Sequence, residues 1–242
     1  MSLSRLRAPP RRGRYQRALT VLRILAVAVS LFLLLPYLIT PLYWLIDPVS
    51  TLMLSRWLTG QRVERTVVPL ERMGPHLPVM VMVAEDGRFC GHRGIDFQEI
   101  KEALDDADLG GEIRGASTIT QQTVKNLFLW HGRSYVRKVL EVPLAMWFDL
   151  ILSKRRIMEI YLNIAEWGPD GVFGAQAAAR RAFDKPAATL SRREAALLAA
   201  SLPNPLARDP RRPGSGLNRL ARLYQSRAAR AGGAKCVRAR RR

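Results

Sequence analysis

Two adjacent acids, Glu85 and Asp86, follow the apolar run Val79–Val83 after a single alanine. A carboxylate at the rim of a buried segment loses hydration, which raises its pKa and suits it to accept a proton near neutral pH. An ordinary polar turn would also place acids here, with Asp86 capping or bracing the loop. Glu85 is therefore a candidate general base whose role depends on the residues around it.

A second group of charged residues lies between two apolar stretches. Arg133, Arg137 and Glu141 are spaced by four, and Lys138 lies three residues before Glu141, so all four gather along one side of a predicted helix. Lys125 lies on the preceding helix. The pattern is that of a solvated charged face or of a site for an anionic head group, and spacing alone does not decide between them.

A polar run separates these two groups, and it contains Thr118, Thr120, Gln121, Gln122 and Thr123. It is either an exposed helix start or a row of hydrogen-bonding groups suited to sugars or amides. The chain has three histidines, and they share no metal-binding spacing. For His92 we predict a structural hydrogen bond.

The elements that must position these residues are mostly helices, because strand signals are few. Asp96 with Glu99 resembles a capping box ahead of an apolar helical stripe, and Pro143 predicts a kink. Further helix starts are predicted at Ser117, at Ser134, and at Ser191 with Glu194. We predict a mostly α fold.

The net charge of +19 is concentrated at the two ends of the chain. Residues 1–23 carry +7 and residues 208–242 carry +11, whereas the rest carries +1. Nucleic acid is therefore not expected as a partner. The predicted organisation is a basic tail (1–23), an anchor (24–46), a juxtamembrane connector (47–78), a globular domain (79–207) and a basic C-terminal segment (208–242).

The predicted anchor, Ile24–Ile46, has 23 residues without a charge, enough to cross a bilayer as a helix. A cleaved signal peptide would have a shorter apolar core that ends at small residues. Seven arginines precede the anchor, which predicts a cytoplasmic N-terminus and an exported domain.

Two features of the sequence leave alternatives open. Cys90 and Cys236 form no disulfide framework, and we predict unpaired thiols, although an oxidising compartment would permit a bond. The C-terminal leucines Leu217, Leu220 and Leu223 predict a short basic amphipathic helix followed by disorder, and such a helix can lie on anionic lipid.

Taken together, the motifs resemble the peptidoglycan glycosyltransferases, the lipid II polymerases found alone or in bifunctional penicillin-binding proteins. The matching signatures occur in order along the chain. They are Glu85-Asp86-x-x-Phe89-x-x-His92-x-Gly94, Gly115–Gln122 with Lys125-Asn126, Arg137-Lys138-x-x-Glu141, Lys154-x-x-Ile157-x-Glu159-x-Tyr161-Leu162-Asn163, and a looser one around Arg181 and Glu194.

The resemblance implies a lysozyme-like α-helical fold with a small membrane-facing subdomain. It implies that Glu85 is the general base toward the acceptor 4-hydroxyl, and that Glu141 is a second catalytic acid at the diphosphate site. Substrate contacts are implied for Ser117, Thr118, Gln121, Gln122, Lys125, Asn126, Arg133, Arg137 and Lys138. Structural roles are implied for Asp86, Phe89, His92, Gly94, Glu159, Tyr161 and Asn163.

The implied reaction joins lipid II into β-1,4-linked glycan strands and releases undecaprenyl diphosphate. Lipid II, the growing lipid-linked strand and membrane lipid are the expected partners, together with other cell-wall synthesis and division proteins. No tightly bound cofactor is expected, and a divalent cation (Mg or Mn) at Glu141 is left open. The expected location is the bacterial inner membrane, with the catalytic domain in the periplasm.

Two other functions are compatible with parts of the sequence. A lytic enzyme of the same fold would also use a glutamate, but it would have no need for a diphosphate site. A non-catalytic membrane-anchored scaffold would not need Glu85. Ser-x-x-Lys and Lys-Thr-Gly motifs are absent from the 242 residues, so we expect cross-linking to depend on other proteins.

Overall fold

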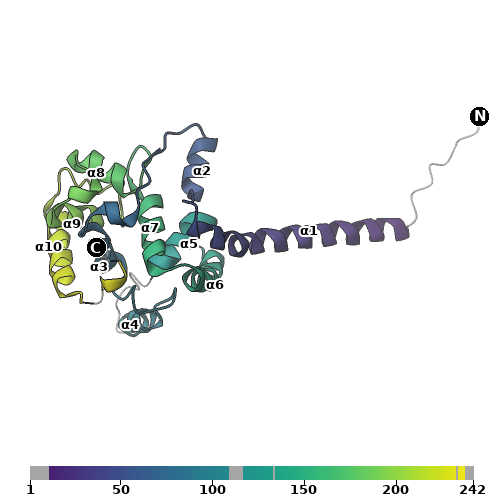
Figure 1. The fold of residues 1–242 in the computed structure, drawn as a ribbon. Helices are drawn as coiled ribbons and strands as arrows, with labels where there is room; N and C mark the ends of the chain where they lie inside the picture. The colour runs from purple at the N-terminus through teal and green to yellow at the C-terminus, as the bar shows by residue number, and fades with distance from the viewer. Residues whose placement is uncertain (1–10, 109–116, 133, 233, 238–242) are drawn as a thin grey trace, which may run out of the picture. The chain divides into compact units, whose positions relative to one another are not determined.

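A computed structural model of the 242-residue chain describes residues 11–108, 117–132, 134–232 and 234–237. The described residues form two units, one of which is the helix α1 (Arg11–Ile39) and the other of which begins at Thr40 (Figure 1).

The first unit is a single long helix that begins within the basic tail and contains Pro36. Residues Tyr15–Trp44 have the length and the apolar composition of a membrane span, and an 18-residue stretch within them has a mean hydropathy of 2.5. The leucine, valine, isoleucine and phenylalanine side chains along α1 are exposed, which is compatible with lipid around them. The helix therefore agrees with single-pass membrane anchoring.

The second unit is mostly helical, which confirms the predicted fold class. Its α-helices are α2 (Thr51–Leu58), α3 (Leu77–Glu85), α4 (Phe97–Asp108), α5 (Ile119–Phe128), α6 (Tyr135–Ile151), α7 (Lys154–Ile164), α8 (Ala175–Phe183), α9 (Arg192–Ser201) and α10 (Ser215–Arg230). The 3-10 helices are η1 (Thr40–Trp44), η2 (Leu70–Met73), η3 (Ala187–Thr189) and η4 (Ala234–Cys236).

A small sheet completes this unit, with strands β1 (Glu64–Arg65), β2 (Glu166–Gly168) and β3 (Val172–Phe173) in the order β1-β3-β2. β1 pairs with β3 in parallel, and β2 pairs with β3 antiparallel. The sheet joins the chain before α3 to the chain after α7.

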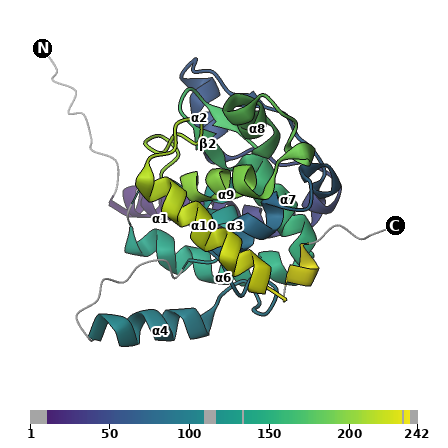
Figure 2. The same cartoon turned by 90° about the vertical axis from the view of Figure 1, so that its left-hand side faces the viewer.

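The apolar run before Glu85 is helical, and α3 is the central helix of the fold. Every residue of Leu77–Val83 is buried, and α3 packs against α9 and α10 (Figure 2). The helix α5 packs against α6 and α7. Because α3 ends at Glu85, burial of its apolar residues fixes where that carboxylate emerges.

Most of the predicted helix starts are correct, and one is displaced by a residue. Ser134 caps α6, and Ser191 with Glu194 forms the predicted capping box of α9. Asp96 accepts from the Glu99 amide at 2.9 Å, although the Glu99 side chain bonds Arg88 rather than completing a box.

The helix α5 begins at Thr118 as its N-cap, not at the predicted Ser117. Thr118 forms a capping box with Gln121, in which each side chain accepts a hydrogen bond from the other residue's backbone. A capping box needs Glu or Gln three residues after the N-cap. Gln121 has that position relative to Thr118, whereas Thr120 has it relative to Ser117.

The predicted boundaries of the anchor and connector are wrong, because residues from Thr40 onward pack into the domain. The Tyr43 ring stacks on Phe128 with centroids 5.9 Å apart, and Trp44 Nε1 donates to the Ile151 carbonyl at 2.9 Å. Met53 and Leu70 are fully or almost fully buried. The predicted boundary at residue 79 is therefore not a boundary of the fold.

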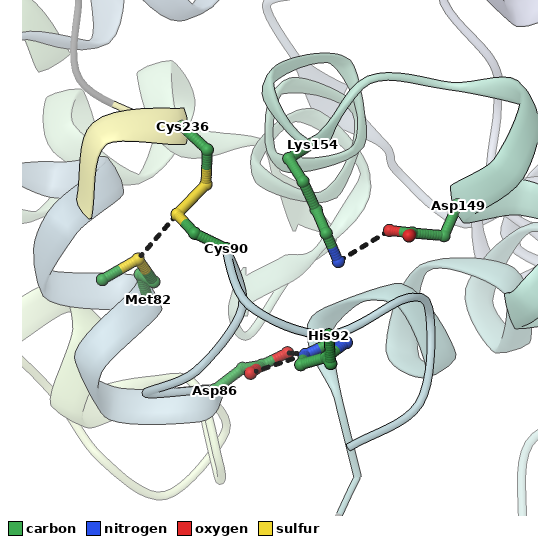
Figure 3. The surroundings of a disulfide bond; sticks show 7 residues. All are labelled: Met82, Asp86, Cys90, His92, Asp149, Lys154 and Cys236. Atoms are coloured by element: carbon green, nitrogen blue, oxygen red, sulfur yellow. Dashed lines mark hydrogen bonds and ion pairs between the residues drawn. A yellow bond between two sulfur atoms is a disulfide. The ribbon is translucent and has the colours of Figure 1, made fainter. Parts of the chain in front are cut away.

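A disulfide joins Cys90 to Cys236, which corrects the prediction of unpaired thiols (Figure 3). The bond links the loop after α3 to η4, across 146 residues of sequence, with the Cα atoms 5.8 Å apart. Sequence spacing did not reveal the pair because α10 brings the C-terminal segment back to α3. Bond formation requires an oxidising compartment.

The predicted C-terminal helix exists, but it packs on the protein. Leu217, Ala221 and Tyr224 are buried, and α10 packs against α9 and α3 (Figure 2). The apolar side of α10 is thus used by the fold rather than by lipid. Disorder was predicted for the residues after this helix. The last five of them, 238–242, lie outside the described residues.

Candidate active site

Glu85 lies where the carboxyl end of α3 meets α5 and α7. Its Oε2 accepts from Gln122 Nε2 at 2.9 Å, and Gln122 Oε1 in turn accepts from the Tyr161 hydroxyl at 3.1 Å. The Tyr161 donor fixes the orientation of the Gln122 amide. Among the described residues, Glu85 Oε1 is buried and accepts no hydrogen bond.

Burial raises the pKa of the Glu85 carboxyl above its ordinary value. The hydrogen bond from Gln122 and the charges of Lys125 and Arg208 oppose this rise, whereas the neighbouring Asp86 adds to it. Desolvation is the largest of these effects, so the carboxyl is a stronger base than an exposed glutamate. The environment predicted from the sequence is therefore present.

Asp86 braces the loop after α3, as predicted. Its Oδ2 accepts from the Ile119 amide at 2.9 Å, and both carboxylate oxygens lie 3.0 Å from His92 Nε2. Ile119 begins α5, where an anionic side chain stabilises the helix. The pair Asp86–His92 thus ties the end of α3 to the start of α5, and Phe89 packs beside it, fully buried.

Gly94 has a structural role that only glycine can fill. Its φ is +79°, and a Cβ there would lie 2.5 Å from the Ala145 carbonyl oxygen of α6. Its own carbonyl accepts from Thr118 Oγ1 at 2.6 Å. Thr118 and the buried Gln121 are therefore engaged in the fold, and the predicted substrate contact of Gln121 has no support from its position.

Glu141 is buried on α6 and holds two of the predicted cations. Its Oε1 accepts from Arg137 at 2.5 Å, and its Oε2 accepts from Lys138 Nζ at 3.0 Å. Lys138 Nζ also donates to Ser117 Oγ at 2.9 Å. The charged side of α6 is therefore a packed network rather than a solvated face.

Lys125 lies one turn beyond Gln122 on α5, between the two acids. Burial lowers the pKa of its ammonium group, the nearby Glu141 raises it, and the charges of Arg137 and Lys138 lower it further. Among the described residues, no hydrogen bond or ion pair ties up its ammonium group. Lys125 lines a small cavity of about 170 Å³ together with Gln122 and Asn126.

Arg133, the other predicted diphosphate ligand, lies outside the described residues. Two residues for which structural roles are implied, Glu159 and Asn163, contact the segment before α3. Asn163 Nδ2 donates to the Val68 carbonyl at 2.9 Å, and Glu159 Oε2 accepts from the Leu70 amide at 2.7 Å. Both fasten the segment before α3 onto α7.

Three arginines near Glu85 were not predicted as site residues. Arg208 influences the Glu85 carboxyl and donates to the Ala200 carbonyl at 2.8 Å. Arg227 and Arg230 line a cavity with Glu85. All three lie in the C-terminal segment 208–242, whose basic composition predicted a tail and not a part of the site.

A half-buried carboxylate at a helix end, next to a lysine and a set of paired cations, is what glycosyl transfer from a diphosphate donor needs. The family comparison agrees, because residues 52–228 match the family model described as transglycosylase. The chain belongs to the transglycosylase family, and it is a peptidoglycan glycosyltransferase that polymerises glycan strands.

Curated relatives are similar over most of their length, and each is named biosynthetic peptidoglycan transglycosylase. The relative from Nitrobacter winogradskyi is 56% identical over 207 residues, which are 86% of this chain and 92% of the relative. The relative from Rhodopseudomonas palustris (strain HaA2) is 57% identical over 85% of this chain and 92% of its own. The one from Agrobacterium fabrum is 54% identical, with 87% and 93% covered.

Proposed function

We propose that Glu85 is the general base that takes the proton from the 4-hydroxyl of the acceptor sugar as the glycosidic bond forms. The observation that carries this proposal is that the two carboxylate oxygens of Glu85 have different surroundings. Gln122 holds Oε2, whereas Oε1 has no partner among the described residues, and Glu85 lines a cavity that can admit the acceptor. An alcohol is a poor nucleophile, so a positioned base accelerates its attack.

The donor diphosphate is placed at Lys125 in this proposal, with Arg133 as a second ligand. Negative charge develops on the diphosphate as it leaves, and a fixed cation stabilises it most in the transition state. Glu141 acts as a positioning residue, because both of its oxygens are used to hold Arg137 and Lys138. The substrates are lipid II and the growing lipid-linked strand.

The contacts of Glu141 do not fit a protein-bound divalent cation. A metal there would have to displace the Arg137 and Lys138 ion pairs, 2.5 and 3.0 Å long. In the described part of the chain, the acids and histidines close enough to share an ion are Asp86, His92 and Asp96, which do not include Glu141. We therefore derive no step through a metal.

The pH dependence of kcat/KM follows from the two shifted groups. Glu85 must be deprotonated, so activity is lost as the pH falls through its raised pKa. Lys125 must be protonated, so activity is lost again as the pH rises through its lowered pKa. We expect a bell-shaped profile.

The profile of Lys125→Arg tests the alkaline side, because a guanidinium keeps its charge. We expect that variant to retain the acid limb and to lose the alkaline limb. A wild-type profile that is flat across the acid range would contradict a titrating Glu85 base. Rates are measured on labelled lipid II in detergent, across the pH range in which each variant stays folded.

We also propose that the N-terminus is cytoplasmic and the catalytic domain periplasmic. The arginines before the span support this orientation, and so does the Cys90–Cys236 disulfide, which forms in an oxidising compartment. The test is alkylation of thiols in intact cells with a mass tag, with and without prior reduction. We expect tagging only after reduction, and tagging of both cysteines without reduction would contradict the orientation.

A further inference from the structure

The cavity that Glu85 lines has no role in the donor-side proposal. It measures about 600 Å³, and its walls include Glu85 and Asp86 from α3, Ser117 and Thr118 from the start of α5, and Arg227 and Arg230 from α10. Lys125 lines a separate cavity of about 170 Å³, which Glu85 does not line. Glu85 therefore faces a cavity on the acceptor side, whereas the diphosphate site proposed at Lys125 lies in the other cavity.

The two arginines in the acceptor-side cavity have no acidic partner in the part of the chain that the structure describes. They lie three residues apart on one side of α10 and are exposed. Within the described residues, Arg230 donates only to Ser226 of its own helix at 3.2 Å. The acids Asp96 and Glu99 line the same cavity but are already paired with Arg88, at 2.8 and 3.0 Å.

The helix that carries the arginines is held in place from two sides. The buried Leu217, Ala221 and Tyr224 fix α10 against the domain. Six residues beyond Arg230, the disulfide from Cys236 to Cys90 fastens the following segment to the loop that carries Asp86 and His92 (Figure 3). Preorganised cations lose little entropy when an anion binds.

We propose that Arg227 and Arg230 form an anion-binding subsite for the acceptor substrate, and that the carboxylates of its peptide stem are the anions bound. This inference rests on the proposed role of Glu85. The guanidinium group matches a carboxylate through two parallel hydrogen bonds. The acceptor diphosphate offers the same anionic chemistry, so the experiment must separate the two sources.

The test compares Arg227→Gln/Arg230→Gln with Arg219→Gln/Arg222→Gln in the full chain. The control pair lies on the same helix with the same spacing, is exposed, and does not line the cavity. Each protein is given lipid II with a free peptide stem and lipid II whose stem carboxylates are amidated, and kcat and KM are measured together with thermal stability.

We expect Arg227→Gln/Arg230→Gln to raise KM for intact lipid II about tenfold with kcat nearly unchanged, the size of a lost charged hydrogen bond. On amidated lipid II, wild type and variant should have the same KM. An unchanged KM on intact lipid II would overturn the subsite, and an equal rise on both substrates would assign the anion to the diphosphate and overturn the stem.

If Arg227 and Arg230 only stabilised the helix, the expected result would differ. Arginines in the last turn also stabilise the helix dipole, and in that case the variant would lose thermal stability without a rise in KM that depends on the substrate. The Arg227→Lys/Arg230→Lys variant should recover part of the lost affinity. The loss of kcat in Glu85→Gln tests the proposed function separately, because both arginine pairs are intact in that variant.

Discussion

Glu85→Gln should polymerise lipid II roughly 10²–10⁴-fold more slowly than wild type, the loss typical of removing a general base. The substitution keeps the size of the side chain and an oxygen that can accept from Gln122, so the hydrogen bond at Oε2 is preserved. What is lost is the ability to accept a proton. The expected change is therefore in kcat, with little change in KM.

The matched control is Glu102→Gln, an exposed acid on α4 that bonds Arg88 and lies outside both cavities. We expect it to resemble wild type. The measurement is the initial rate of lipid II consumption, together with thermal stability of each protein. A Glu85→Gln enzyme that folds and retains most of its kcat would remove Glu85 from the chemistry.

Lys125→Met should lower kcat by roughly 10²–10³-fold, as expected when one fixed group that stabilises developing charge is removed. Met fills a similar volume in the half-buried site and carries no charge. A second effect follows from the field of Lys125 at Glu85, which lowers the pKa of that carboxyl. Without it, the acid limb of the pH profile should move to higher pH.

The shifted limb distinguishes an electrostatic role from loss of folding, because unfolding lowers activity without moving a pKa. Lys101→Met, an exposed lysine on α4, serves as the control and should leave rate and profile unchanged. A Lys125→Met enzyme with wild-type kcat would contradict the donor-site assignment, and an unmoved acid limb would contradict the proximity of the two charges.

Local sequence signals predicted the helices and the environment of Glu85 well. Apolar periodicity and capping residues are short-range features, and they located α4, α6 and α9. The Glu85 prediction succeeded for the same reason, because the buried run that desolvates it is adjacent in sequence.

Features that depend on the path of the chain through space could not be predicted in this way. Nothing near Cys90 in sequence indicates Cys236, and the pair exists because α10 packs across α3 and α9. Arg227 and Arg230 reach the cavity by the same route. The segment before α3 looked like a connector because its contacts are with α7, about 90 residues away.

The central claim is that the protein polymerises glycan strands, and the most direct test is to measure strand lengths before and after the reaction. The full chain, with its anchor, is supplied separately with labelled lipid II and with preformed glycan strands in detergent, and the products are resolved by length. We predict a ladder of glycan strands from lipid II and no shortening of preformed strands. Shortening of the preformed strands without a ladder from lipid II would contradict the account and place the protein among lytic enzymes.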